Sequence, residues 1–183
     1  VDLYIACYTD TPRELPTPVC EAAGQRIHCN PHTYSGVPDL LIENVGNGHL
    51  ADRSESSGVA FFAEYGLGES IADLNLDGTP EIFVANDGDR NVLFQRTSPW
   101  QYDEIALVSG LAYNGQGESM GAMGIACADF DRNGWLDILT TNFAFERNVL
   151  CSNLGNLAFV DQSQGTAIDH SSRASVGWSA ITM

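Results

Sequence analysis

A nine-residue acidic motif occurs twice in this chain, at 73–81 and at 129–137. Each copy carries an oxygen-bearing side chain at relative positions 1, 3, 5 and 9, and a glycine at position 6. Calcium takes about 6–8 oxygen ligands, and glycine permits the sharp turn that points alternate side chains inward. The duplicated motif therefore predicts two calcium-binding loops in a repeat protein.

The expected ligands follow from the loop positions. Side chains supply most of them, and the position-7 residues, Thr79 and Trp135, are expected to contribute backbone carbonyls by analogy with other calcium loops. The first loop would use Asp73, Asn75, Asp77, Thr79 and Glu81, and the second would use Asp129, Asp131, Asn133, Trp135 and Asp137.

The sequence around each motif is also repeated. A glycine-rich segment precedes each motif, an apolar run follows it, and the tetrapeptide Arg-Asn-Val-Leu closes the match at 90–93 and 147–150. The runs are short, rich in β-branched residues and separated by Gly, Asn and Asp, which indicates strands and turns. About four strands of about 5–6 residues per repeat are typical of β-propeller blades.

We therefore expect an all-β chain: a β-propeller segment of about three four-stranded blades, with a calcium loop between the first two strands of each repeat. The chain would be one propeller segment, cut within a repeat at both ends. Its expected parts are a partial first repeat (1–65) with an insertion at 9–38, a second repeat (66–120), a third repeat (121–174) and the start of a further repeat (175–183). In this alignment Thr182 would occupy the first position of a further loop.

A propeller ring needs about 4–8 blades. The remaining blades would come from a longer parent chain or from a neighbouring subunit.

These loops and their flanks resemble FG-GAP/VCBS-type propeller repeats, in the branch associated with an ASPIC/UnbV domain and including cartilage-acidic-protein-like proteins. The resemblance extends over essentially the whole chain, including the cysteine-containing segment 20–41, Glu118-Ser-Met-Gly121 and Phe159-Val-Asp161. It implies secreted, periplasmic or cell-surface propellers that are stabilised by calcium and act by interaction rather than by catalysis.

The cysteines leave several states open. Cys20 and Cys29 flank an insertion that has no counterpart in the other repeats. The resemblance and its exported context favour a disulfide across this insertion. A Zn²⁺ site made with His28 and His32, or two free thiols, remain as alternatives. Cys7, Cys127 and Cys151 lie in strand-like runs and are expected to be buried structural thiols.

Charge excludes one class of partner. The formal net charge is −16, and only eight Lys or Arg residues are present. Binding to nucleic acid relies on clusters of basic side chains, so no nucleic-acid partner is expected. The sequence also has no apolar run of the length, about 18 residues, that a membrane-spanning helix needs.

In a four-stranded blade, the loops between the first and second strands emerge on one face of the ring. The connections between the second and third strands, and those that lead to the next blade, emerge on the opposite face. The insertion and the connection 108–121 would both lie on this opposite face, and long loops on a rigid scaffold are common binding sites. The residues expected to contact a partner there are Arg26, His28, Tyr34, Tyr113 and Asn114.

Catalysis has no recognisable residue set, because the four histidines lack Ser/His/Asp or metal-hydrolase spacing. The expected function is a non-enzymatic calcium-binding module for extracellular adhesion, protein interaction or complex assembly, with a protein, a neighbouring subunit or a glycan as partner. The alternative is the calcium-stabilised propeller of a carbohydrate-binding or carbohydrate-active enzyme.

Overall fold

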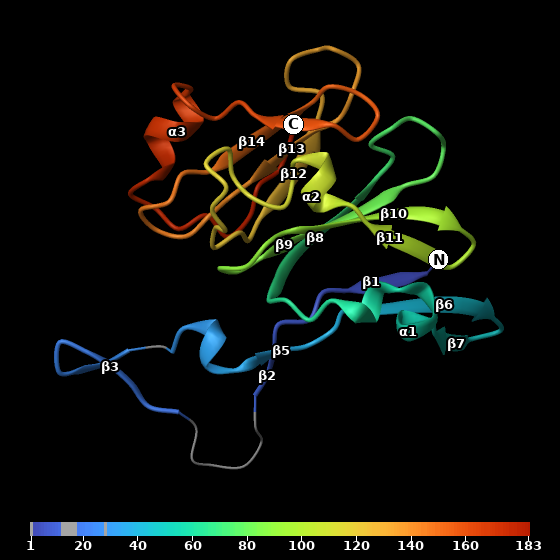
Figure 1. The fold of residues 1–183 in the computed structure, drawn as a ribbon, viewed down its shortest axis with the longest axis horizontal. Helices are drawn as coiled ribbons and strands as arrows, with labels where there is room; N and C mark the ends of the chain where they lie inside the picture. The colour runs from blue at the N-terminus through green and yellow to red at the C-terminus, as the bar shows by residue number, and fades with distance from the viewer. Residues whose placement is uncertain (1, 12–17, 28) are drawn as a thin grey trace.

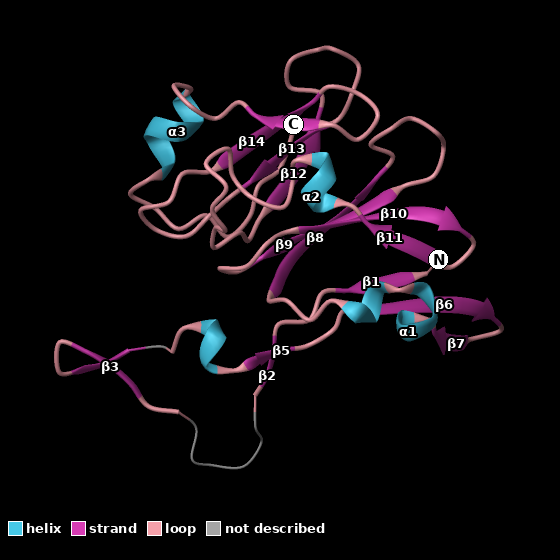
Figure 2. Ribbon diagram, in the orientation of Figure 1, coloured by secondary structure: helices cyan, strands magenta, loops and turns pink. Residues whose placement is uncertain are grey.

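The chain forms a row of antiparallel sheets in the computed structural model, which describes residues 2–11, 18–27 and 29–183 (Figure 1). The strands are β1 (Leu3–Ile5), β2 (Thr9–Asp10), β3 (Cys20–Ala22), β4 (Gln25–Ile27), β5 (Ser35–Gly36), β6 (Leu40–Gly46), β7 (His49–Asp52), β8 (Gly66–Ala72), β9 (Glu81–Asn86), β10 (Val92–Ser98), β11 (Gln101–Glu104), β12 (Ile125–Ala128), β13 (Asp137–Thr140), β14 (Val149–Asn153) and β15 (Phe159–Asp161). Strands and loops dominate the described chain, as Figure 2 shows, so the prediction of an all-β fold is confirmed.

Three of the sheets have the strand order of propeller blades. Blade 1 contains β1-β6-β7, blade 2 contains β8-β9-β10-β11, and blade 3 contains β12-β13-β14-β15, in spatial order. All neighbouring strands in these sheets are antiparallel. The insertion forms two small sheets of its own, β2-β5 and β3-β4, and extends away from the blades in Figure 1.

Strand β9 is the most deeply buried strand, because blade 2 lies between the other two blades. Ile82 and Val84 pack in a cluster with Leu41 of blade 1, whereas Phe83 packs in a second cluster with Ile138 of blade 3. Alternate side chains of a strand point to opposite faces of its sheet. A sheet covered on both faces needs apolar side chains at successive positions, which explains the unbroken apolar run in this strand.

The innermost strands of adjacent blades approach closely. A Cβ atom on Gly68 of β8 would overlap the carbonyl oxygen of Met123, which precedes β12. At the equivalent place in blade 3, a Cβ atom on Gly124 would lie 2.6 Å from Cα of Ser179. Only glycine leaves room for these contacts, so the glycine-rich leads of the repeats set the distance between blades.

One hydrogen bond recurs between successive repeats and defines their register. The backbone N–H of Gly66 donates to the carbonyl of Cys7, that of Ala122 donates to Asn86, and that of Gly177 donates to Asn142. In this register Thr182 aligns with Ile71 and Cys127. The expectation that Thr182 takes the first position of a further calcium loop was therefore wrong by two residues, because the leads hold several glycines and the wrong one was matched.

Three short α-helices follow the outer strands of the blades: α1 (Ser54–Ser57), α2 (Ala106–Ser109) and α3 (Ala167–Ser172); two 3-10 turns, η1 (Pro31–Thr33) and η2 (Val59–Phe61), complete the elements. The sequence did not predict these helices. Helices α1 and α2 end at Gly58 and Gly110, whose φ angles of 92° and 87° are in the left-handed region that glycine adopts readily. Within the described residues, every helix is too short or too polar to cross a lipid bilayer.

Candidate functional site

The acidic loop of blade 3 is closed by its own side chains. Asp129 accepts hydrogen bonds from the backbone N–H of Asn133 at Oδ1 (3.0 Å) and of Gly134 at Oδ2 (2.9 Å). Oδ1 of Asp131 accepts a second bond from the same Asn133 N–H at 3.0 Å, and Oδ1 of Asn133 accepts one from Trp135 at 2.8 Å. The loop is therefore wound so that oxygen atoms from alternate positions point inward.

The loop of blade 2 repeats this arrangement residue by residue. Asp73 accepts from the backbone N–H of Asp77 at 3.1 Å and of Gly78 at 2.9 Å. Oδ1 of Asn75 accepts from Asp77, and Oδ1 of Asp77 accepts from Thr79 at 2.8 Å. The positions predicted from the sequence as metal ligands are thus the positions that shape both loops.

The backbone explains the glycine at position 6. Gly78 and Gly134 have φ angles of 87° and 94°, and the residues at position 4, Leu76 and Arg132, are also left-handed, with φ of 57° and 63°. Two left-handed residues so close together turn the chain back on itself. The glycine lowers the cost of this turn, because it has no Cβ atom to clash.

The position-9 carboxylates lie beneath the loops, in the interior. Glu81 is 1% exposed and Asp137 is 0% exposed. Glu81 accepts from the N–H of Leu74 at 2.9 Å, and Asp137 accepts from the N–H of Phe130 at 2.8 Å. Burial raises the pKa of the Glu81 carboxyl, the Leu74 N–H opposes this shift, and the nearby Asp77 and Asp73 add to it.

The donor set suits a hard cation. Asp129, Asp131 and Asp137 each offer one carboxylate oxygen, and these oxygens lie within 4.8 Å of one another. It is the one acidic group of this compactness among the described residues, and the corresponding set of blade 2 is not drawn together to the same degree. Oxygen-only donors favour Ca²⁺ or Mg²⁺ over the softer metals that select Cys and His.

A residue not predicted from the sequence joins the two loops. Asn153, at the end of β14, is 0% exposed, and its side-chain Nδ2 donates to the carbonyl of Leu74 at 2.8 Å and to that of Leu136 at 3.0 Å. Leu74 is in the loop of blade 2, and Leu136 is in the loop of blade 3. An asparagine at the end of a strand normally indicates a turn, so no pattern in the sequence indicated this contact.

The insertion, the loop after β9 and the connection 108–121 lie at the ends of the strands opposite the acidic loops. Tyr8, which directly precedes the insertion, donates from its hydroxyl to Asp87 at 2.6 Å, and His32 of the insertion has its Nε2 3.2 Å from the carbonyl oxygen of Gly88. The N–H of Gly88 in turn donates to the carbonyl of Met120 at 3.0 Å. These contacts make the insertion, the loop after β9 and the connection 108–121 one continuous surface, which we name the loop-rich face.

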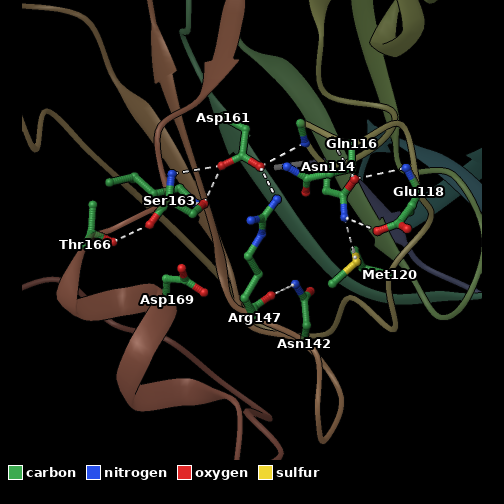
Figure 3. A network of polar contacts seen from close by, with 12 residues as sticks. Asn114, Gln116, Glu118, Met120, Asn142, Arg147, Asp161, Ser163, Thr166 and Asp169 are labelled. Carbon is green, nitrogen blue, oxygen red and sulfur yellow. Dashed lines mark hydrogen bonds and ion pairs between the residues drawn. The ribbon is translucent and has the colours of Figure 1, made fainter.

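Asp161 holds the part of the loop-rich face that belongs to blade 3 (Figure 3). Its carboxylate accepts from the N–H of Gly115 at 2.8 Å, from Arg147 at 3.2 Å and from the N–H of Ser163 at 2.8 Å. Burial acts to raise the pKa of Asp161, but the hydrogen bonds from Ser163, Gly115 and Arg147 outweigh it and lower the pKa. Three segments of the chain are fixed by this one carboxylate.

The residues expected to contact a partner differ in accessibility. Arg26 is exposed in β4, Tyr113 is 38% exposed, and Tyr34 is half-buried with its carbonyl bonded to the hydroxyl of Tyr65. Asn114 is 8% exposed and is occupied in holding its own loop, with its side chain bonded to Glu118 and Met120 (Figure 3). His28 lies outside the described residues.

Cys20 and Cys29 form a disulfide, with Cα atoms 5.2 Å apart. This confirms the favoured state and excludes both the zinc site and the free thiols at these positions. Of the other cysteines, Cys151 is buried, and Cys7 and Cys127 are half-buried, all as free thiols. Burial is the main cause that raises the pKa of Cys151 to about 12, so this thiol is neutral and unreactive at physiological pH.

Comparison with known proteins agrees with this architecture. Residues 73–140, which run from the first acidic loop through β13, match the model of the FG-GAP-like repeat. Residues 73–140 therefore resemble the FG-GAP-like repeat, and they lie within two four-stranded sheets of the same topology.

More particularly, the chain is similar to cartilage acidic protein 1. It is 27% identical over 133 residues to the protein of Xenopus tropicalis and 24% identical over 128 residues to that of Mus musculus, and each match covers 70% of the chain. The chain spans about a fifth (19%) of the length of these relatives. The match at 73–140 and the similarity to the cartilage acidic proteins agree with the resemblance that the sequence motifs indicated.

Proposed function

We propose that this chain is a calcium-stabilised, non-enzymatic part of a β-propeller that serves adhesion or assembly outside the cell. The observation that carries the proposal is the identical hydrogen-bonded frame of the two acidic loops, in which Asp73 and Asp129 each receive two backbone N–H groups. Ca²⁺ would be held by the ten residues expected from the sequence. It would neutralise carboxylates that are otherwise close together, which stabilises the loops.

The proposed location outside the cell rests on three supports. A disulfide such as Cys20–Cys29 persists in oxidising compartments. Extracellular calcium modules bind the ion at about 10⁻⁴–10⁻³ M, so they fill outside the cell and stay empty inside it. The similarity to cartilage acidic protein 1 is in line with this location.

Calorimetric unfolding of the purified protein tests the calcium sites. In about 1 mM CaCl₂, tenfold saturation at two sites would stabilise the fold by about 3 kcal/mol relative to excess EGTA. The calcium-dependent increase in Tm should fall in the Asp77→Ala and Asp131→Ala variants, each of which loses one side-chain ligand. The exposed Asp103→Asn variant, in β11, is the control and should keep the full increase.

A melting temperature that is the same in CaCl₂ and EGTA would contradict the proposal. The acidic loops would then be ordinary Asx turns, stabilised by the hydrogen bonds described above.

We further propose that the loop-rich face contacts the partner, with Arg26, His28, Tyr34, Tyr113 and Asn114 at or beneath the contact. Deletion of residues 13–33 removes most of the insertion, and binding of a protein partner should weaken by at least about tenfold, or about 1.4 kcal/mol. Tyr113→Ala tests the other part of this face. Unchanged affinity in both variants would show that the partner does not bind to this face. Calcium-dependent binding to glycans instead of proteins would favour a carbohydrate-binding propeller.

The other blades of the ring would come from the rest of the protein or from a neighbouring subunit. Adjacent blades pack through buried apolar clusters, as blades 1, 2 and 3 do here. Such a module presents a rigid scaffold on which the loops of one face can vary.

A further inference from the structure

One buried amide contacts both acidic loops. Nδ2 of Asn153 donates to the carbonyl oxygens of Leu74 and Leu136, at 2.8 and 3.0 Å. These carbonyls belong to position 2 of the loop in blade 2 and position 8 of the loop in blade 3. The side chain therefore spans the boundary between two blades and ties one loop backbone to the other.

The other polar groups of Asn153 are also engaged. Its backbone N–H donates to Oδ1 of Asp137 at 2.8 Å, and its carbonyl accepts from Nδ2 of Asn133 at 3.0 Å. Its side-chain Oδ1 accepts from the N–H of Gly155 at 2.9 Å. Because the residue is fully buried, rotation of the amide would leave several of these groups without partners, so its orientation is fixed.

The contact with Leu74 leads directly to a proposed ligand. The N–H of Leu74 donates to Oε2 of Glu81, the position-9 carboxylate of its loop, at 2.9 Å. The side chain of Leu74 is 1% exposed and packs in the same core cluster as Ile138 of blade 3. A short chain of hydrogen bonds thus runs from Glu81 through Leu74 and Asn153 to Asp137.

The equivalent positions in the other blades do not carry this bridge. In blade 2 the position is Arg96, which is exposed and donates through Nε to the carbonyl of Ser98. In blade 1 it is Asn44, whose N–H donates to Asp2 at 2.9 Å and whose Oδ1 accepts from Gly46 at 3.0 Å. Asn44, which is exposed, therefore repeats two of the contacts that Asn153 makes within its own blade, and it provides a control for them.

We propose that Asn153 couples the two loops, so that Ca²⁺ in one loop raises the affinity of the other for Ca²⁺. The inference rests on the proposed function, in which both loops bind the ion. Binding to one loop orders the backbone that holds the Asn153 amide, and the ion entering the second loop then meets a backbone that is already ordered. Such prior ordering produces positive cooperativity without a large structural change.

The test measures each site while the other is disabled. Asp73→Ala removes the first ligand of the loop in blade 2, and calcium binding to the loop in blade 3 is followed by calorimetry and by the luminescence of Tb³⁺ sensitised by Trp135. We expect the affinity of the loop in blade 3 to fall by about fivefold, the lower end of typical coupling. Asp129→Ala should weaken the loop in blade 2 by the same factor, because coupling between two sites is reciprocal.

Asn153→Ser then isolates the bridge. A serine hydroxyl can accept from the N–H of Gly155 in the same type of turn, but it is too short to reach Leu74. In this background Asp73→Ala should no longer change the affinity of the loop in blade 3. In the Asn44→Ser background the fivefold effect should persist. Should the serine variant fail to fold, Asn153→Thr replaces it, since a β-branched residue suits the end of a strand.

The outcomes separate the two proposals. Two loops that bind Ca²⁺ with affinities independent of each other would overturn the coupling and leave the calcium sites standing. If the coupling between the loops survived Asn153→Ser, it would be carried by the packing of Leu74, and the role of the amide would be overturned. A protein that binds no Ca²⁺ at either loop would overturn the proposed function, and the coupling with it.

Discussion

Glu104 accepts a hydrogen bond from the backbone N–H of Leu93 at 3.3 Å, and so links the outermost strand of blade 2 to its neighbour. Blade 3 makes the same link in two steps: Ser163 accepts from the N–H of Leu150 at 2.8 Å and donates to Asp161. Blade 1 also uses two steps, through Ser54 and Asp52. Blade 2 has Ala106 where the others have serine, and the longer side chain of glutamate bridges the gap.

This relationship predicts that Glu104→Asp destabilises the protein and that adding Ala106→Ser restores it. The shorter carboxylate leaves the buried N–H of Leu93 unsatisfied, which costs about 1–3 kcal/mol. The double variant recreates the Asp-Ser pair of blade 3. Urea unfolding of the two single variants and the double variant measures the effect. If the double variant were no more stable than Glu104→Asp alone, an Asp-Ser pair would not replace the link that Glu104 makes to Leu93.

The glycines between blades predict a second effect. Gly68→Ala and Gly124→Ala each place a Cβ atom against the backbone of the next repeat, and the blades must separate to accept it. We expect each variant to lose about 1–3 kcal/mol, the usual range for overpacking.

The control for this prediction is Ser70→Ala, in the same strand as Gly68, which removes one hydroxyl and adds no volume. Thermal unfolding of the three variants side by side is the measurement. If Gly68→Ala were as stable as the wild-type protein, the close contact between inner strands would not limit the spacing of blades.

The lowered pKa of Asp161 predicts a specific acid sensitivity. A carboxyl group whose pKa is lower in the folded state stabilises the fold above its unfolded pKa, about 3.9, and this stabilisation is lost as the pH falls through the folded value. Asp161→Asn should therefore be less stable than the wild-type protein at pH 7, and should lose less stability on going to pH 3. Urea midpoints at both pH values measure this.

Asp103→Asn, on an exposed part of β11, serves as the control for the acid experiment. Both variants keep the acidic loops, so the pH dependence of those loops cancels in the comparison. Parallel losses of stability in Asp161→Asn and wild-type protein between pH 7 and pH 3 would refute the assignment.

The disulfide predicts a local effect. Cys20 and Cys29 close the β3-β4 hairpin, which forms a sheet separate from the blades. We expect the Cys20→Ser/Cys29→Ser variant to melt with the Tm of the wild-type protein but to be cut faster by trypsin after the exposed Arg26. Limited proteolysis followed by mass spectrometry measures the rate of cleavage. A Tm lowered by more than about 4 °C, or about 1 kcal/mol, would mean that the hairpin stabilises the blades.

Local patterns in the sequence predicted most of the strands and both acidic loops. The duplicated motif and its apolar flanks are contiguous, so their geometry follows from nearby residues. The short helices α1 and α2 were missed because one turn of helix has no periodicity to detect, although Gly58 and Gly110 mark their ends.

The parts that could not be predicted depend on contacts between distant residues. Asn153 and Leu74 are 79 residues apart, and nothing local distinguishes Asn153 from an ordinary turn residue. Asn114 was expected at a contact surface because it lies in a long loop, but its side chain is committed to Glu118 and Met120. The choice between an exposed and a buried polar side chain depends on the packing of the whole loop.

The hairpin closed by Cys20 and Cys29 has its two ends only 5.2 Å apart, measured between Cα atoms. A segment whose ends meet can be exchanged for another of different length without displacing its surroundings. Residues 21–27 are therefore a natural acceptor for a grafted peptide epitope or a fluorescent label, carried on a scaffold whose blades lie elsewhere.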